Sequence, residues 1–98
     1  MKIAETKDVP PGRGAAFEVE GRRIALFNVD GRFYAISDLC PHNEGPLSEG
    51  KVEGFAVVCP WHGARFDLRT GAVLEHSAAE SVKSYRLTVE NDNIMVEI

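Results

Sequence analysis

Two stretches of the sequence decide its fold: Cys40-Pro41-His42 and, after sixteen intervening residues, Cys59-Pro60-Trp61-His62. Each stretch places a cysteine and a histidine around a proline, and Gly63 follows the second stretch. Proline and glycine are typical of shaped loops rather than of helices or strands. The apolar run Phe55-Ala56-Val57-Val58 leads into the second stretch and is typical of a strand. The pattern therefore predicts two loops flanking a strand, with four sulfur and nitrogen donors able to converge.

The rest of the chain also favours short strands. Residues 22–29 and 32–37 flank Asp30-Gly31, a pair suited to the positive φ angles of a tight hairpin turn. Residues 15–20 alternate between two faces before a turn at Gly21, and a short strand is expected near 72–74. A strand over 82–90 is expected to turn at 91–93 into a final strand over 94–98. Evidence for helices is thin. The sequence predicts an all-β fold.

Composition limits the possible functions. The chain has 98 residues, enough for one domain, with 44% apolar and 27% charged residues. Its formal net charge of −4 opposes binding to nucleic acid. No stretch approaches the roughly 20 apolar residues of a membrane span, and residues 1–8 lack the apolar core of a signal peptide. We therefore expect a cytoplasmic protein with no nucleic-acid or membrane partner.

The two Cys/His stretches resemble the signature of Rieske iron–sulfur proteins. The likeness includes both prolines, Gly63 and the segment Pro46-Leu47-Ser48-Glu49-Gly50 after the first loop. The length and the rhythm of strands are similar to those of small Rieske-type ferredoxins, so the resemblance covers nearly the whole chain. It implies an antiparallel β-sandwich or barrel with a small cluster-binding subdomain of two loops. The expected single Rieske domain spans 1–98, with a base of 1–37 and 70–98 and a cluster-binding subdomain of 38–69.

The resemblance also implies the cofactor, a Rieske-type [2Fe-2S] cluster. Cys40 and Cys59 would bind one iron as thiolates, and His42 and His62 would bind the other as neutral imidazoles. These four residues are the predicted metal ligands, and the resemblance implies no catalytic residue. Two ferric ions, two sulfides, two thiolates and two imidazoles sum to zero charge, whereas four thiolates would give −2, so reduction is easier with the mixed ligands.

Two other interpretations of the four residues remain open. A Cys₂His₂ set could bind zinc, although structural zinc sites usually have C-x₂₋₄-C and H-x₃₋₅-H spacing. The residues could instead be two buried thiols and two surface histidines, which the prolines and Gly63 around them disfavour.

The surroundings of the predicted cluster indicate a low reduction potential. High-potential respiratory Rieske proteins have a serine and a tyrosine whose hydroxyls donate hydrogen bonds to cluster sulfurs, and Ala64 and Phe66 stand at the matching positions here. Those proteins also have a disulfide between the two loops, and Gly45 and Trp61 lie near the corresponding places. The chain therefore resembles the soluble, low-potential subgroup.

Several further residues have two interpretations. Trp61 either covers the cluster or fills the core, and Pro46-Leu47 either covers the cluster or forms an ordinary turn. The charges nearby either contact a partner or form a solvated face; they are Glu44, Glu49, Glu53 and Arg65.

The resemblance implies an electron-transfer protein rather than an enzyme. A soluble monomeric carrier of this family passes single electrons from a flavin-dependent reductase to a terminal oxygenase or another oxidoreductase, as in bacterial aromatic-ring dioxygenase systems. The alternatives are a small Rieske-like subunit of a larger oxidoreductase, such as an assimilatory nitrite reductase, and a redox-sensing or structural module. No second metal set and no Gly-rich nucleotide loop accompany the motif.

Overall fold

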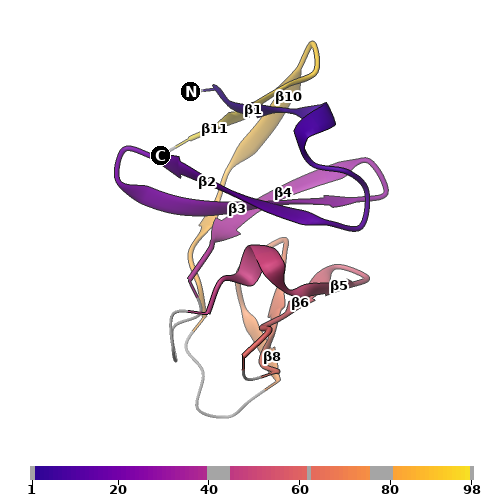
Figure 1. The fold of residues 1–98 in the computed structure, drawn as a ribbon, viewed down its shortest axis with the longest axis vertical. Helices are drawn as coiled ribbons and strands as arrows, with labels where there is room; N and C mark the ends of the chain where they lie inside the picture. Colours follow the sequence, from indigo (N-terminus) through magenta and orange to yellow (C-terminus); the bar gives the residue numbers. More distant parts are fainter. Residues whose placement is uncertain (1, 40–44, 62, 76–80, 98) are drawn as a thin grey trace.

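The computed structural model describes residues 2–39, 45–61, 63–75 and 81–97. These residues form three antiparallel sheets. The central sheet has the strand order β2-β3-β4-β9, a second sheet has the order β1-β11-β10, and a third has the order β5-β6-β7-β8. Figure 1 shows the central sheet across the middle of the molecule, with the second sheet above it and the third below it.

The strands are short, as the spacing of turn residues predicts. In the central sheet they are β2 (Gly14–Val19), β3 (Arg22–Val29), β4 (Arg32–Ser37) and β9 (Ser84–Tyr85). The second sheet contains β1 (Lys2–Glu5), β10 (Leu87–Glu90) and β11 (Asn93–Val96). The third contains β5 (Lys51–Glu53), β6 (Ala56–Val58), β7 (Arg65–Asp67) and β8 (Val73–Glu75). Two single turns of 3₁₀-helix accompany them, η1 (Thr6–Asp8) and η2 (Leu47–Glu49).

Strand β3 is buried on both faces and separates two apolar cores. Its residues 24–28 are all buried, and successive side chains of a strand point to opposite faces. Ile24 and Leu26 pack into a core shared with the β1-β11-β10 sheet. Ala25 and Phe27 pack into a second core, which contains residues of the β5–β8 sheet. The central sheet is therefore the common support of the other two.

The predicted hairpin at Asp30-Gly31 is confirmed. Strands β3 and β4 pair in antiparallel register from Val29↔Arg32 to Ile24↔Ser37. Both turn residues adopt positive φ, 51° at Asp30 and 88° at Gly31. This is the backbone geometry for which a two-residue Asp-Gly turn is favoured.

The single strand predicted over residues 82–90 is wrong, because the chain changes sheets at Arg86. Strand β9 pairs with β4 in the central sheet, and β10 pairs with β11 in the second sheet. The alternation of apolar residues continues through Arg86, so the pattern contains no sign of the change. The predicted C-terminal hairpin itself is confirmed, with Glu90↔Asn93 as its last pair.

The all-β prediction is confirmed, since the only helical segments among the described residues are the two single 3₁₀ turns. The division into a base and a cluster-binding subdomain stays a prediction. In the part of the chain that the structure describes, no helix has the length and apolar character needed to cross a bilayer.

Candidate metal centre

Cys59 lies at the end of β6 and is almost completely buried. It is 1% exposed and carries a free thiol. Its side chain belongs to the core between the central and third sheets, together with Leu47, Ala64 and Phe66. A thiol in this position faces apolar groups and is shielded from water, which suits a structural metal ligand rather than a surface-reactive cysteine.

The loop after Cys59 closes as a tight turn between β6 and β7. The backbone N–H of Cys59 donates to the carbonyl oxygen of Ala64 at 2.7 Å, and the N–H of Gly63 donates to the carbonyl oxygen of Cys59 at 3.0 Å. Gly63 adopts φ +77°, in the left-handed region that a side chain would disfavour. Glycine at this position therefore lets the chain reverse directly after the predicted ligand His62.

The ends of the first loop are also held together. The N–H of Leu47 donates to the carbonyl oxygen of Asp38 at 2.6 Å, and an antiparallel bridge joins Leu39 to Pro46. Turn η2 follows directly, and the Leu47 side chain is fully buried. Leu39 and Pro46, on either side of the segment that carries Cys40 and His42, thus lie side by side.

The third sheet brings the two loops to the same end of the molecule. Lys51, at the start of β5, pairs with Val58, the residue before Cys59. Gly50 approaches the same place so closely that a Cβ atom there would lie 2.2 Å from the carbonyl oxygen of Val58. Only glycine allows this approach. Gly50 and Lys51, which follow turn η2 after the first loop, therefore lie beside the strand that leads into the second loop.

Three of the four predicted ligands, Cys40, His42 and His62, lie outside the described residues. The same holds for Glu44. The structure therefore places Cys59 and both pairs of loop ends, and the complete ligand set stays a prediction.

The residues around Cys59 fit the thiolate half of a Rieske cluster. The donor is a soft sulfur on a short, closed loop, and the neighbouring Ala64 and Phe66 are both fully buried. Neither side chain has a hydroxyl that could donate to a cluster sulfur, in agreement with the low potential expected from the sequence.

Trp61 and the neighbouring charges differ from one another in their surroundings. Trp61 is 62% exposed, so the interpretation that it fills the core is wrong. Arg65 Nη1 lies 2.7 Å from Glu53 Oε1, and both side chains are about one-third exposed, so these two charges form an ion pair. Glu49 is exposed, whereas Leu47 fills the core.

A carboxylate that the sequence did not single out holds the first loop. Asp38 is fully buried, and its Oδ1 accepts the N–H of Ser48 at 2.7 Å. Arg23 Nε lies 2.8 Å from Asp38 Oδ2, but Oδ2 has no hydrogen-bond partner among the described residues, so this contact is ionic. Nothing in the sequence marks Asp38 as functional, because it belongs to no motif and no periodic pattern. Its contact with Arg23 appears only once the chain is folded.

Asp67 and Arg69 form a second ion pair at the turn between β7 and β8. Arg69 Nη2 lies 3.0 Å from Asp67 Oδ2, and the N–H of Arg69 donates to Asp67 Oδ1 at 2.7 Å. The side-chain hydrogen bond from Arg69 is the main reason why the pKa of Asp67 lies below its ordinary value. The Arg69 guanidinium also stacks on Phe55, with 4.7 Å between its central carbon and the ring centroid.

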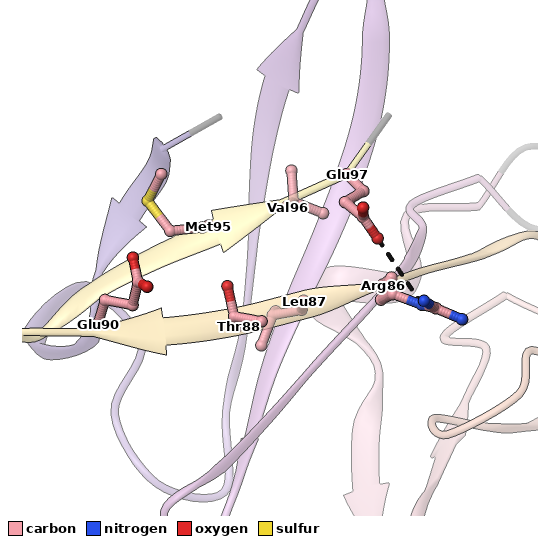
Figure 2. Close-up of a pocket in the computed structure, with 7 residues that line it drawn as sticks. All are labelled: Arg86, Leu87, Thr88, Glu90, Met95, Val96 and Glu97. Carbon is pink, nitrogen blue, oxygen red and sulfur yellow. Dashed lines mark ion pairs between the residues drawn. The ribbon is translucent and has the colours of Figure 1, made fainter.

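A groove on the β10–β11 hairpin lies apart from the predicted centre. Figure 2 shows Thr88, Glu90 and Met95 lining it, with the ion pair between Arg86 and Glu97 at its edge. It contains no cysteine or histidine. Its sheet contributes to the core on the opposite side of β3 from Cys59. The groove is therefore separate from the metal centre.

Comparison with known proteins agrees with this arrangement of loops. The family model for the Rieske [2Fe-2S] domain matches residues 1–86. The chain belongs to the Rieske family. Among its curated relatives is the ferredoxin component of the naphthalene 1,2-dioxygenase/salicylate 5-hydroxylase systems of Ralstonia sp., which is 36% identical over 93% of this chain and 88% of the relative.

Solved Rieske structures have the same fold. The ferredoxin of carbazole 1,9a-dioxygenase from Nocardioides aromaticivorans IC177 superposes with a TM-score of 0.92 at 33% identity, covering 98% of this chain and 94% of the other. A ferredoxin in complex with the oxygenase of carbazole 1,9a-dioxygenase gives 0.89 at 28% identity, covering 99% and 100%. A protein assigned as a nitrite reductase small subunit gives 0.90 at 30% identity, covering 100% and 97%.

These comparisons confirm three sequence predictions. The cofactor of this Rieske protein is a [2Fe-2S] cluster, its fold is the Rieske fold, and it is an electron-transfer protein rather than an enzyme in its own right. The zinc interpretation is therefore set aside.

Proposed function

We propose that this Rieske protein is the ferredoxin of an oxygenase system, accepting single electrons from a flavin-dependent reductase and delivering them to a terminal oxygenase. The observation that carries the proposal is the full-length match to ferredoxin components of dioxygenase systems, both in sequence and in fold. The cluster supplies one-electron chemistry when it is bound. The chain itself supplies a buried thiol, closed loops and an exposed end at which partners can approach.

We propose Cys40, His42, Cys59 and His62 as the cluster ligands. Three observations support this set: the buried Cys59 thiol, the closure of the second loop around Gly63, and the pairing of the ends of both loops. The first loop lies between Leu39 and Pro46, and strand β5, which follows it after turn η2, pairs with the strand that leads into the second loop. This arrangement supports a set of four ligands drawn from both loops.

The exposed Trp61 indicates where partners approach. It precedes the proposed ligand His62 and is 62% exposed, so a large aromatic surface lies beside the predicted histidine side of the cluster. Aromatic side chains are enriched where proteins bind one another. We propose that reductase and oxygenase contact this end in turn, and that the protein works as a monomer in the cytoplasm.

The ligand set is tested by low-temperature EPR of the dithionite-reduced protein together with iron and sulfide analysis. We expect about two irons and two sulfides per chain, and g values typical of a cluster with mixed nitrogen and sulfur ligands. Replacing His62 with Cys should shift the g values towards those of an all-thiolate cluster. A diamagnetic, colourless protein would refute the ligand set.

The carrier role is tested by electron transfer between separately purified components. The reduced protein is mixed with an oxidised Rieske oxygenase of an aromatic-ring dioxygenase system, and reoxidation is followed by absorbance. We expect multiple turnovers in the presence of NADH and a flavin-dependent reductase. The subunit alternative, suggested by the nitrite reductase neighbour, predicts instead a stable stoichiometric complex that survives gel filtration.

A further inference from the structure

Asp38 makes four contacts near the first loop, two with Arg23 and two with Leu47 and Ser48. Its N–H donates to the carbonyl oxygen of Arg23 at 3.0 Å, and its carbonyl oxygen accepts the N–H of Leu47 at 2.6 Å. Its side chain accepts the N–H of Ser48 at 2.7 Å and contacts the guanidinium of Arg23. One residue thus joins the central strand β3 to both ends of the first loop.

The carboxylate of Asp38 is unusual because it is fully buried. Burying a charge is costly unless it is paired and hydrogen-bonded, and removing one partner leaves the other uncompensated. Oδ1 has a backbone donor, whereas Oδ2 has the ionic contact with Arg23, whose side chain is 49% exposed. The pair is therefore asymmetric, with a buried anion on the side of the loop and a partly solvated cation behind it.

The position of Asp38 places this anion close to the cluster. Only Leu39 separates it from the proposed ligand Cys40, and two residues of extended chain span about 7 Å at most. Charges in a buried environment are screened much less than charges at the surface. A negative charge at this distance opposes the addition of an electron, and a positive charge favours it.

We propose that Asp38 is a positioning residue for the Rieske cluster, fixing both ends of the first ligand loop, and that the Asp38–Arg23 pair sets the reduction potential of the cluster. The proposal rests on the ligand set proposed above. The loop contribution comes from the hydrogen bond to Ser48, which a neutral acceptor can replace. The contribution to the reduction potential comes from the charges of the pair, and a neutral acceptor cannot replace those charges.

Three substitutions separate the two contributions. Asp38→Asn keeps an oxygen acceptor for the N–H of Ser48 and removes the negative charge, so cluster retention stays near wild type while the midpoint potential rises. Arg23→Gln leaves the buried carboxylate without its counter-charge, so the potential falls. Asp38→Ala removes the acceptor as well, and the cluster is lost at least about fivefold faster, because an unpaired buried donor is costly.

Glu97→Gln is the matched control. It also removes one carboxylate from an arginine pair, but Arg86 and Glu97 are 84% and 74% exposed and lie 3.7 Å apart. Solvent screens such a pair, so neither the potential nor the cluster retention should change. Figure 2 shows the pair at the edge of the β10–β11 groove.

The measurements are protein-film voltammetry, EPR and the rate of bleaching of the visible absorbance in a chelator. Opposite shifts of potential in Asp38→Asn and Arg23→Gln, with unchanged g values and partial cancellation in the double variant, support the proposal. Shifts of the same sign, or none beyond that of Glu97→Gln, overturn it. Arg23 is half exposed, so its variant carries the test even where Asp38→Asn fails to fold.

The outcome also distinguishes this inference from the proposed function. A wild-type protein without the mixed-ligand EPR signal overturns the ligand set and this inference together. A wild-type protein with that signal, combined with unresponsive Asp38 and Arg23 variants, overturns only the inference.

Discussion

At the scale of single residues, the surroundings of the proposed ligand Cys59 matter as much as the ligand itself. Cys59 lies in a core with Ala64 and Phe66, and neither of these two side chains can donate a hydrogen bond. Hydrogen bonds to cluster sulfurs stabilise the reduced state, so the absence of hydroxyls at these two positions favours a low potential.

Hydroxyls at these two positions should therefore raise the potential. For the double variant Ala64→Ser and Phe66→Tyr we expect a rise of roughly 40 to 80 mV, since one net hydrogen bond is worth about 1 kcal/mol and a tenfold change in a one-electron equilibrium corresponds to about 59 mV. Protein-film voltammetry measures the change. Ala35→Ser, in the other core, is the control and should leave the potential unchanged. An unchanged or lowered potential in the double variant would contradict the argument.

Single residues also mark the limit of prediction from the sequence. The Asp30-Gly31 turn was predictable because its conformation depends on local chemistry, and all four ligand positions could be proposed because the two Cys/His stretches resemble the Rieske signature. Asp38 and Arg23 could not, since their contact depends on the fold bringing β3 beside the first loop. The change of sheet at Arg86 was missed because the apolar alternation runs through it unbroken.

At the scale of elements, the alignment of the two loops depends on the close contact between η2 and β6. Gly50 lies where a side chain would meet the carbonyl oxygen of Val58. Its own φ is −74°, so the constraint is the close approach and not an unusual backbone conformation.

Gly50→Ala should therefore separate the loops. We expect a loss of about 1–3 kcal/mol in unfolding free energy from overpacking, together with faster loss of the cluster. Gly31→Ala is the control: Gly31 has φ +88° and open space around it, so it should cost about 1 kcal/mol without affecting cluster retention. Urea unfolding and the bleaching rate measure the two effects. Wild-type cluster retention in Gly50→Ala would exclude this role for the contact.

The turn between β7 and β8 should give the protein part of its sensitivity to acid. Hydrogen bonds from Arg69 lower the pKa of Asp67 below 3.8. A group with a depressed folded pKa stabilises the protein above its unfolded pKa, and this contribution is lost as the pH falls through the folded value. Asp67→Asn should thus have a lower unfolding free energy than wild type near neutral pH. The difference between the two proteins should become smaller below about pH 4.

Urea unfolding between neutral pH and about pH 3 measures the difference in unfolding free energy between Asp67→Asn and wild type. Thr88→Ala, at an exposed position without an ionisable side chain, should show a difference from wild type that changes little with pH. If the difference for Asp67→Asn stays constant down to about pH 3, the ion pair does not contribute to the loss of stability in acid.

At the scale of the whole molecule, the two cores predict an uneven response to loss of the metal. Cys59 belongs to the core between the central and third sheets, whereas Ile94 and Val96 belong to the core on the other side of β3. We therefore expect the second sheet to keep its packing when the cluster is removed.

Hydrogen exchange should reveal this difference. After removal of iron with a chelator under reducing conditions, we expect the amides of β5–β7 to exchange at least about tenfold faster, and those of β10 and β11 to change little. Equal acceleration in all three sheets would show that the two cores unfold as one unit.

The exposed indole of Trp61, next to His62 in the sequence, is an intrinsic fluorescence probe of cluster occupancy. Trp61 is the only tryptophan of the chain, so all indole fluorescence reports on the tip of the second loop. An iron–sulfur cluster within a few residues absorbs in the range where indole emits, so it quenches the indole fluorescence by energy transfer. The holoprotein should accordingly have weak indole fluorescence, and its intensity should rise as the cluster is lost. Cofactor occupancy can then be measured in dilute samples without an added dye.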